Sequence, residues 1–252
     1  MEHLSSVKNS CRLLKFFLQS PSKELGVSDL SRKLSLSKGA VHKMLATLES
    51  EGFIRQNPAT KQYCLGYTLL ELGNQVLKDH NLSEFVKPYL QNLAAMSHEL
   101  ITLCVKDDRD AIYVEKIDSQ YPIRFNVDMY RRFPLYATSA ARVIFAHCDS
   151  ALIDELLDEE IHTFTPYSFI DPEAIKTRLR EIKQQGYEMS SNMRNVGVTG
   201  IAAPLFNANG EVTASISIIG PSDRMLPLKD KLIEQIVGVT REISSKLGYH
   251  AN

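Results

Sequence analysis

The 252-residue chain has no tryptophan, only four cysteines, and no apolar run approaching the length of a membrane span. A helix that crosses a bilayer needs about 20 apolar residues, so no membrane partner is expected. The cysteines form no CxxC pair and do not cluster with histidine, which argues against a disulfide framework or a metal site. Met1 to Ser10 lacks the apolar core of a signal peptide. These absences predict a folded protein of the reducing cytoplasm that carries no metal and no cofactor.

The near-neutral formal charge of -1 conceals an uneven distribution. Residues 1–66 carry ten lysines and arginines against five acids, whereas the rest of the chain carries 19 against 25. A basic segment joined to an acidic one is typical of a protein that binds a polyanion with one domain. Charged runs are also often no more than a solvated surface, so the interpretation depends on what the basic segment contains. The length allows one or two domains, and the charge favours two.

Two short helical patterns, separated by Ser35-Leu36-Ser37, lie within the basic segment. Apolar residues recur at helical spacing over 27–34 and again over 41–48, so each helix is expected to bury one face. The other face of the second helix carries side chains that the major groove of DNA accepts from an inserted helix. These are Lys38, His42, Lys43 and Thr47, preceded by Ser37 as an N-cap or phosphate contact. His42 could equally be a surface residue without a role.

A basic hairpin pattern follows the second helix. Residues 53–56 and 61–65 are typical of short strands, and the turn-forming sequence Asn-Pro-Ala-Thr stands between them. Arg55 and Lys61 flank the tip, where they could neutralise phosphates or enter the minor groove. The order of elements predicts a winged helix-turn-helix DNA-binding domain over residues 1–66.

Amphipathic helices are predicted on both sides of this motif. The first runs from about Ser6 to Gln19, with an apolar stripe at Val7, Cys11, Leu14 and Leu18. A second, beginning at the capping-box pair Thr68 and Glu71, connects the two domains over residues 67–80. A third, over about 83–97, has its stripe at Leu82, Phe85, Tyr89, Leu93 and Met96. The last two helices could form a dimer interface, but the third could equally pack on its own domain.

Strand and helix patterns alternate over residues 81–252, which indicates an α+β domain with an antiparallel-rich sheet. Apolar runs flank turn sequences near 106–110 and 207–210 and predict two hairpins. The alternation of Ile123, Phe125 and Val127 is typical of a further strand. Helices are expected after Asp171, ending before Gly186, and at the end of the chain.

Several strings resemble those of the IclR-type bacterial transcription regulators. The recognition segment LSKGAVHKML at 36–45 is similar to the family's LPKSTVHRLL, and the wing closes with the family's Tyr-x-Leu-Gly at 63–66. PLYATS at 134–139 and GIAAPLFN at 200–207 resemble two segments of its effector domain. These strings span almost the whole chain in the right order. The resemblance implies a GAF-like effector domain, a palindromic double-stranded DNA operator, and homodimers that often pair into tetramers.

The resemblance also places an effector pocket. Its expected residues are Thr138, Ser139, Ala140, Ser190, Val198, Gly200 and Ile201. Independently, residues 138–146 predict the start of a helix rich in small residues, and the N–H groups and dipole of a helix N-terminus suit a carboxylate. A small organic or aromatic acid is therefore the expected effector. The small residues could instead reflect tight packing alone, with Thr138 only as a cap.

Four positions depart from the family pattern. Gly39 and Ala40 replace two hydroxyl residues of the recognition helix, Met193 stands where glutamate is usual, and Gly200 stands where cysteine or serine is common. Operator contacts and pocket polarity therefore cannot be transferred from relatives.

Two other classes of function stay open. An enzyme would need a catalytic motif, and the sequence contains no GxSxG, phosphate loop or dinucleotide fingerprint, so no catalytic residue is assigned. A non-specific DNA-binding module would lose its affinity at physiological salt, whereas an operator reader would keep a preference of about 10³ or more. The preferred interpretation is a metabolite-controlled transcription regulator, with repression as the preferred sign of action.

Overall fold

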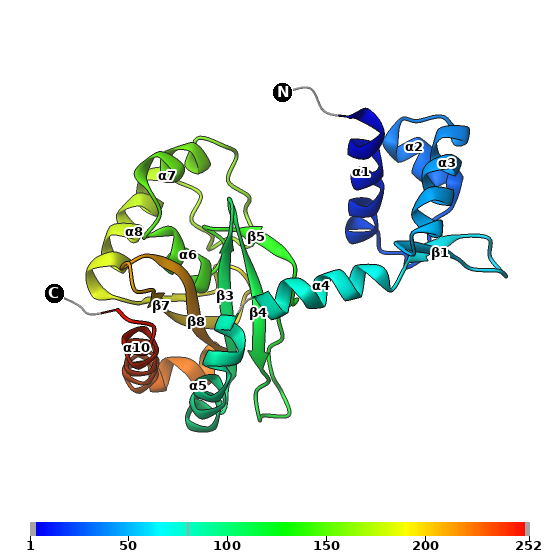
Figure 1. Ribbon diagram of the computed structural model, residues 1–252. Helices are drawn as coiled ribbons and strands as arrows, with labels where there is room; N and C mark the ends of the chain where they lie inside the picture. The colour runs from blue at the N-terminus through cyan, green and yellow to red at the C-terminus, as the bar shows by residue number, and fades with distance from the viewer. Residues whose placement is uncertain (1–3, 80, 250–252) are drawn as a thin grey trace. The chain divides into compact units, whose positions relative to one another are not determined.

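The computed structural model describes residues 4–79 and 81–249, and the chain divides into two compact units, Met1–His80 and Asn81–Asn252 (Figure 1). The elements of the N-terminal unit, in chain order, are α1 (Ser5–Gln19), α2 (Val27–Leu34), α3 (Lys38–Ser50), β1 (Ile54–Gln56), β2 (Tyr63–Leu65) and α4 (Thr68–Asp79). Helices followed by a two-stranded antiparallel hairpin give the expected helix-turn-helix with a wing.

The core of the N-terminal unit contains two buried apolar residues from each of the helices α1, α2 and α3. Leu13 and Phe17 of α1 pack with buried apolar residues of α2 and α3 and with Ile54 and Tyr63 of the wing. The stripe predicted for α1 is wrong, because Val7 and Leu18 are exposed. Apolar residues occur in adjacent pairs in this helix, at 13–14 and 16–17, so periodicity alone cannot choose which side faces the core.

Helix α4 begins where the sequence predicted, but by another arrangement. The Thr68 hydroxyl donates to the Glu51 carbonyl at 3.4 Å rather than accepting from its own helix, so the predicted capping box is wrong. The first bonds of the helix go instead to the Tyr67 carbonyl, from Leu70 and Glu71. Gly52 makes this junction possible, since a Cβ there would lie 2.6 Å from the Thr68 hydroxyl.

The C-terminal unit is built on one antiparallel sheet with the strand order β5-β4-β3-β8-β7-β6. The strands are β3 (Leu100–Asp107), β4 (Asp110–Ile117), β5 (Arg132–Pro134), β6 (Glu188–Ser191), β7 (Val198–Phe206) and β8 (Val212–Pro221). Adjacent strands β3 and β4, and β7 and β8, form the two predicted hairpins. The α+β architecture expected from the sequence is therefore confirmed.

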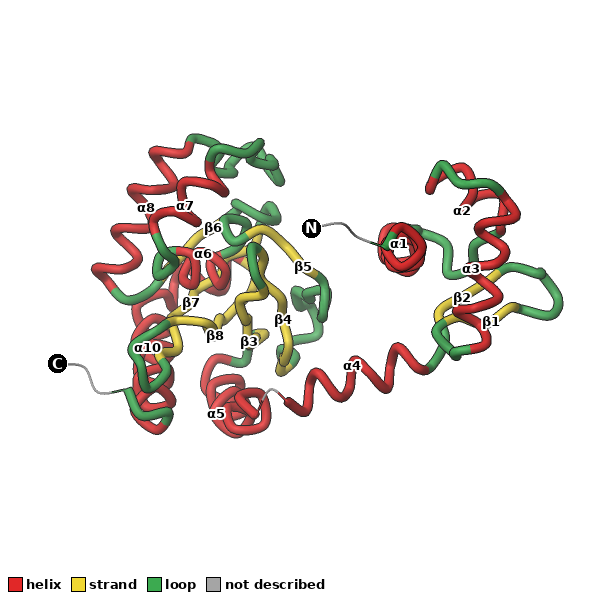
Figure 2. The backbone as a smooth tube through the Cα atoms, turned by 45° about the horizontal axis from the view of Figure 1, so that its top comes forward, coloured by secondary structure: helices red, strands yellow, loops and turns green. Residues whose placement is uncertain are grey.

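Helices cover both faces of this sheet (Figures 1 and 2). They are α5 (Asn81–Ser97), α6 (Ser139–Phe145), α7 (Ser150–Leu157), α8 (Pro172–Gln185), α9 (Ser222–Met225) and α10 (Lys229–Lys246), with a 3-10 turn, η1 (Leu226–Leu228), between the last two. One apolar core lies between the sheet and α6 to α8, and a second lies between the sheet, α5 and α10. No helix in the described ranges combines the length and the apolarity that a membrane crossing requires.

Two expectations for the C-terminal unit are corrected. In the stripe predicted for α5, Leu93 is fully buried but Phe85 is 38% exposed, and Val86 and Leu90 are buried against the sheet and α10 instead. This helix therefore packs on its own unit, which is one of the two arrangements that the sequence left open. The alternating residues 123–127 form no strand. Phe125 and Val127 pack against the core from a loop, and Ile123 is 80% exposed, so the alternation marks a loop that covers apolar surface.

Candidate nucleic-acid interface and ligand cavity

The solvent face of α3 presents the side chains that the sequence singled out. Val41 and Leu45 are fully buried and fix which side of the helix faces outward. Five predicted contact residues are all exposed: Ser37, Lys38, His42, Lys43 and Thr47. The N-cap role of Ser37 is confirmed, because its hydroxyl accepts from the Ala40 N–H at 3.2 Å. The Thr47 hydroxyl donates to the Lys43 carbonyl at 3.0 Å and keeps its acceptor capacity.

The wing places its two cations on either side of the turn. Arg55 and Lys61 are both exposed, and the Arg55 guanidinium lies 5.3 Å from the centre of the Tyr67 ring. Lys61 has a positive φ of 57°, and its carbonyl accepts from the Gln56 amide at 3.0 Å. Stacking of this kind limits the conformations of Arg55 without removing its charge.

A distant glutamate fixes the tip of the wing. Glu24 accepts from the Asn57 amide at 2.6 Å and from the Thr60 hydroxyl at 2.7 Å. These two hydrogen bonds, the one from Asn57 first, lower the pKa of Glu24 below its ordinary value of 4.5. Sequence reasoning missed Glu24, because it lies more than 30 residues from its partners and belongs to no motif.

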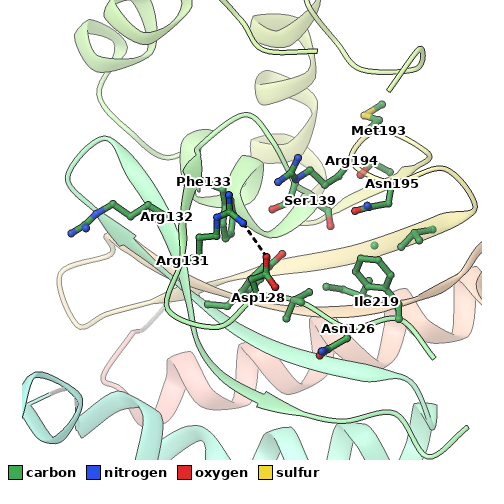
Figure 3. Close-up of a pocket in the computed structure, with 17 residues that line it drawn as sticks. Asn126, Asp128, Arg131, Arg132, Phe133, Ser139, Met193, Arg194, Asn195 and Ile219 are labelled. Atoms are coloured by element: carbon green, nitrogen blue, oxygen red, sulfur yellow. Dashed lines mark hydrogen bonds and ion pairs between the residues drawn. The ribbon is translucent and has the colours of Figure 1, made fainter. Parts of the chain in front are cut away.

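A cavity of about 280 Å³ opens in the C-terminal unit (Figure 3). Strands β4 to β8 and the start of α6 contribute to its wall, together with the loop before β5 and the loop between β6 and β7. Much of the wall is apolar and aromatic: Tyr113, Phe125, Val127, Phe133, Val198 and Ile219. Tyr113 and Phe133 lie with their ring centres 4.8 Å apart. Burial raises the pKa of the Tyr113 hydroxyl, so this hydroxyl stays protonated at neutral pH, and the interaction with Thr138 opposes the shift only in part.

Five of the seven residues expected to bind the effector line this cavity: Thr138, Ser139, Ser190, Val198 and Gly200. Ala140 and Ile201 do not line it. Ala140 is fully buried, and its carbonyl accepts from the Ser215 hydroxyl at 2.8 Å. Ile201 lies in the opposite core with α5 and α10. Side chains alternate along β7, so a strand that turns Val198 and Gly200 towards the cavity turns Ile201 away from it.

The start of α6 is less open to an anion than the sequence suggested. The Thr138 hydroxyl accepts from the Ala141 N–H at 3.1 Å, so it caps the helix and occupies one of its free donors. The helix is only seven residues long. Gly200 is a packing requirement here, because a Cβ at this position would lie 2.4 Å from the Ser139 hydroxyl oxygen. Ser139 therefore fills the space that a larger residue at 200 would take.

Three arginines line the cavity, and sequence reasoning missed all of them. Arg131 pairs with Asp128 at 3.3 Å, and Arg132 pairs with Asp107. Arg194 lies 3.9 Å from the centre of the Phe164 ring. Loss of water around it, and then the nearby charge of Arg131, lower the pKa of Arg194, which stays fully charged at neutral pH. These residues lie on loops or at a strand edge, where no periodic pattern marks them.

The residues that the structure describes contain no cluster of side chains suited to bind a metal ion. No three side chains among His, Cys, Asp and Glu gather there closely enough to hold a metal ion.

Comparison with known protein families decides the identity of both units. The IclR helix-turn-helix domain matches residues 6–58, and the bacterial transcriptional regulator IclR C-terminal domain matches residues 74–245. The chain belongs to the IclR family. It is a DNA-binding transcription regulator with an effector-binding C-terminal domain.

Named relatives and a solved structure agree with this assignment. The chain is 30% identical over 253 residues to the HTH-type transcriptional regulator XynR of Escherichia coli K12, covering 100% of both chains. It is 24% identical to the transcriptional repressor IclR of the same organism, over 97% of this chain and 90% of that one. An IclR homologue from Microbacterium hydrocarbonoxydans, solved with 4-hydroxybenzoate, superposes with a TM-score of 0.81 at 21% identity, over 96% of this chain and 99% of that one. The named relatives are regulators rather than enzymes.

Proposed function

We propose that this IclR-family regulator binds a palindromic operator as a homodimer or a dimer of dimers, and that a small organic or aromatic acid in the cavity controls its operator affinity. Repression is the proposed sign of action. The observation that carries the proposal is the combination, in one chain, of an exposed cationic recognition helix and an arginine-lined cavity. We assign DNA binding to residues 1–66, the connection to 67–80, and effector binding and oligomerisation to 81–252.

The N-terminal unit supports direct reading of DNA. Lys38 and Lys43 are exposed cations on the recognition helix, and His42 can donate to or accept from a base edge. Arg55 and Lys61 extend the cationic surface onto the wing. Cations of this kind contribute affinity through phosphates, whereas side chains that reach base edges contribute specificity.

The cavity supports an acid as effector. Arginines bind carboxylates through paired, charge-assisted hydrogen bonds, and an aromatic wall favours a planar ligand. The IclR homologue with a similar fold holds 4-hydroxybenzoate, which is itself an aromatic acid.

The loop before β5 offers a route from the cavity to α5. The Ser119 hydroxyl and the Gln120 N–H both donate to the carbonyl of His98, which directly follows α5, at 2.8 and 3.1 Å. The same loop continues into Phe125 and Asp128 of the cavity wall. A shift of this loop on binding would therefore reach the end of α5.

A partly buried ion pair reinforces this connection. Arg224 donates to both carboxylate oxygens of Glu99 at 2.6 and 2.9 Å, and its third contact is the carbonyl of Ile123 in the same loop, at 3.1 Å. Because α5 follows the connecting helix in the chain, an effector that prefers one arrangement of this loop could favour one arrangement of α5 and the segment before it.

Two linked measurements test the proposal. Sequences selected by the purified protein from a random DNA pool at physiological salt are expected to contain an inverted repeat. Affinity for that repeat is then measured by fluorescence anisotropy across a panel of metabolites, and at least one acid should change it by fivefold or more, within the usual range of about 5- to 150-fold for coupled sites. Selection of no sequence, or an affinity that no ligand alters, would contradict the proposal.

A further inference from the structure

The charges around the cavity leave one arginine without an acid. Arg131 is paired with Asp128 and Arg132 with Asp107. Within the described ranges, Arg194 has neither a hydrogen-bonded nor an ion-paired partner, and it contacts the face of Phe164 instead. Among the described residues, two of the three arginines of the cavity wall are therefore paired with a carboxylate, and the charge of Arg194 is left for a ligand to neutralise.

The position of Arg194 suits the capture of a ligand. It comes from the loop between β6 and β7, and Figure 3 shows its side chain reaching across the cavity towards Ser139, whereas Arg132 points away. Stacking on Phe164 holds the guanidinium plane while its N–H groups stay free. Ser139 supplies a second donor that has no hydrogen-bond partner among the described residues. A fixed fork beside a hydroxyl matches the two oxygens of one carboxylate.

The rest of the wall restricts what is attached to that carboxylate. Tyr113, Phe125 and Phe133 present three aromatic rings to the cavity. Its volume of about 280 Å³ lies just below the range of about 300 to 1,000 Å³ that holds drug-sized ligands, so a one-ring compound fits better than a larger one. A second carboxylate on the ligand would have to compete for Arg131 and Arg132, which already pair with Asp128 and Asp107, or would meet neutral groups of the wall.

We infer that Arg194 is the specificity-determining residue of the effector site: it binds the carboxylate of a one-ring aromatic monocarboxylate and excludes neutral analogues and dicarboxylates. This inference rests on the proposed function, since it names the ligand class of the same cavity. It moves carboxylate recognition from the α6 N-terminus, which the sequence favoured, to a side chain of the loop between β6 and β7.

The test compares acids with their neutral analogues on the full-length protein. Benzoate, 4-hydroxybenzoate and other ring-substituted benzoates are titrated by calorimetry beside the matching benzamides and the dicarboxylates succinate and phthalate. At least one benzoate is expected to bind at least about tenfold more tightly than its benzamide and than either dicarboxylate, because a charge-assisted hydrogen bond contributes about 1.5 to 3 kcal/mol. This comparison uses the wild-type protein and does not depend on the folding of a variant.

Variants then identify the cation. Arg194→Gln should weaken the tightest benzoate at least about tenfold and abolish its preference over the benzamide, and Arg194→Lys should restore part of that preference. Arg124→Gln is the matched control, because it removes an exposed arginine of the loop before β5 that is not part of the cavity wall, and it should change affinity by less than about threefold.

Several results would overturn the inference while leaving the proposed function intact. They are equal binding of acids and amides, a preference for a dicarboxylate, or an Arg194→Gln variant that binds benzoates as the wild type does. Binding of no benzoate, together with an operator affinity that changes with a non-aromatic acid, would do the same. If no metabolite changed the operator affinity, the proposed function itself would be contradicted.

Discussion

The two units of this regulator differ in how their candidate functional residues are distributed along the chain. The candidate DNA-binding residues lie between Ser37 and Lys61, on one helix and one hairpin, and all of them are exposed. The cavity residues come from separate strands and loops between Tyr113 and Ile219. A surface of the first kind can be recognised from a short stretch of sequence, whereas a cavity of the second kind exists only once distant segments have met.

The two regions also differ in how they treat charge. The candidate DNA-binding cations of the N-terminal unit face solvent. In the C-terminal unit, Arg142 and Glu188 are 2% and 0% exposed and pair at 3.0 Å, and Glu188 also accepts from Arg178 at 2.8 Å. Burial lowers the pKa of Arg142, and the charge of Glu188 opposes this effect. Buried charge makes this unit sensitive to changes that the N-terminal surface would tolerate.

Glu188→Gln should have the largest effect on stability. It leaves Arg142 buried without a counter-charge, and we expect the free energy of unfolding of the C-terminal unit to fall by about 3 to 5 kcal/mol. Urea unfolding followed by circular dichroism measures this loss. The control is Glu181→Gln, which removes the half-exposed partner of Arg178 and should cost less than about 1 kcal/mol. If both variants lost the same free energy of unfolding, burial would not explain the difference expected between the Arg142–Glu188 and Arg178–Glu181 pairs.

The paired change Lys38→Ala/Lys43→Ala should have the next largest effect, on DNA rather than on stability. Operator affinity should fall by about 10- to 100-fold, and the slope of log affinity against log salt should become shallower by about one for each phosphate that is no longer neutralised. Anisotropy at several salt concentrations gives both values. Lys229→Ala/Lys231→Ala removes the same charge from exposed positions of α10. Should this control lose as much affinity, the cations of α3 would have no special role.

Gly200→Ala should lower the free energy of unfolding of the C-terminal unit by about 2 kcal/mol, because the new methyl group would collide with the Ser139 hydroxyl oxygen. Adding Ser139→Ala should recover most of the loss, since the nearest remaining atom, the Cβ of residue 139, lies at 3.6 Å. Thermal unfolding checks both. Gly238→Ala, in α10 with open space around it, should stabilise by about 0.5 to 1 kcal/mol instead. A double variant no more stable than Gly200→Ala would refute the steric explanation.

Glu24 should give the smallest effect, a pH dependence confined to the wing. Its pKa is lowered in the folded state by Asn57 and Thr60, so its contribution is fully present above the ordinary value of 4.5 and is lost as the pH falls through the lowered value. Hydrogen exchange at Ala59 and Thr60 should therefore accelerate in that window, after correction for the intrinsic rate.

Glu24→Gln tests the origin of this dependence. It should abolish the acceleration, whereas Glu51→Gln, which changes an exposed carboxylate at the end of α3, should preserve it. An unchanged pH profile in Glu24→Gln would assign the effect to another group.

Particular residues show how far sequence reasoning reached. Helical spacing predicted that Val41 and Leu45 are buried and that Lys43 faces solvent, because α3 has one unambiguous apolar stripe. The same reasoning failed for α1, where adjacent apolar pairs fit two stripes equally well, and favoured Leu14 and Leu18 over the buried Leu13 and Phe17. For the cavity, the resemblance named seven residues on strands and the start of a helix, and five of them line it.

Loops account for most of what sequence reasoning missed in the cavity. The alternation around Phe125 predicts a strand where the structure has a loop, and no sequence signal marks Arg131 or Arg194. Neither periodicity nor a motif applies to a loop residue whose partners lie far away in the chain.

By itself, the sequence determined the properties that depend on neighbours a few residues apart: the helix faces, the Ser37 cap, the turn of the wing and the basic character of the N-terminal segment. Only the tertiary structure decided which charges are paired and which are free. Arg131, Arg132 and Arg194 are alike as sequence letters, yet two of them face carboxylates and one faces an aromatic ring. The reason is physical, because the electrostatic state of a side chain depends on distances of a few ångströms between segments that the chain order does not bring together.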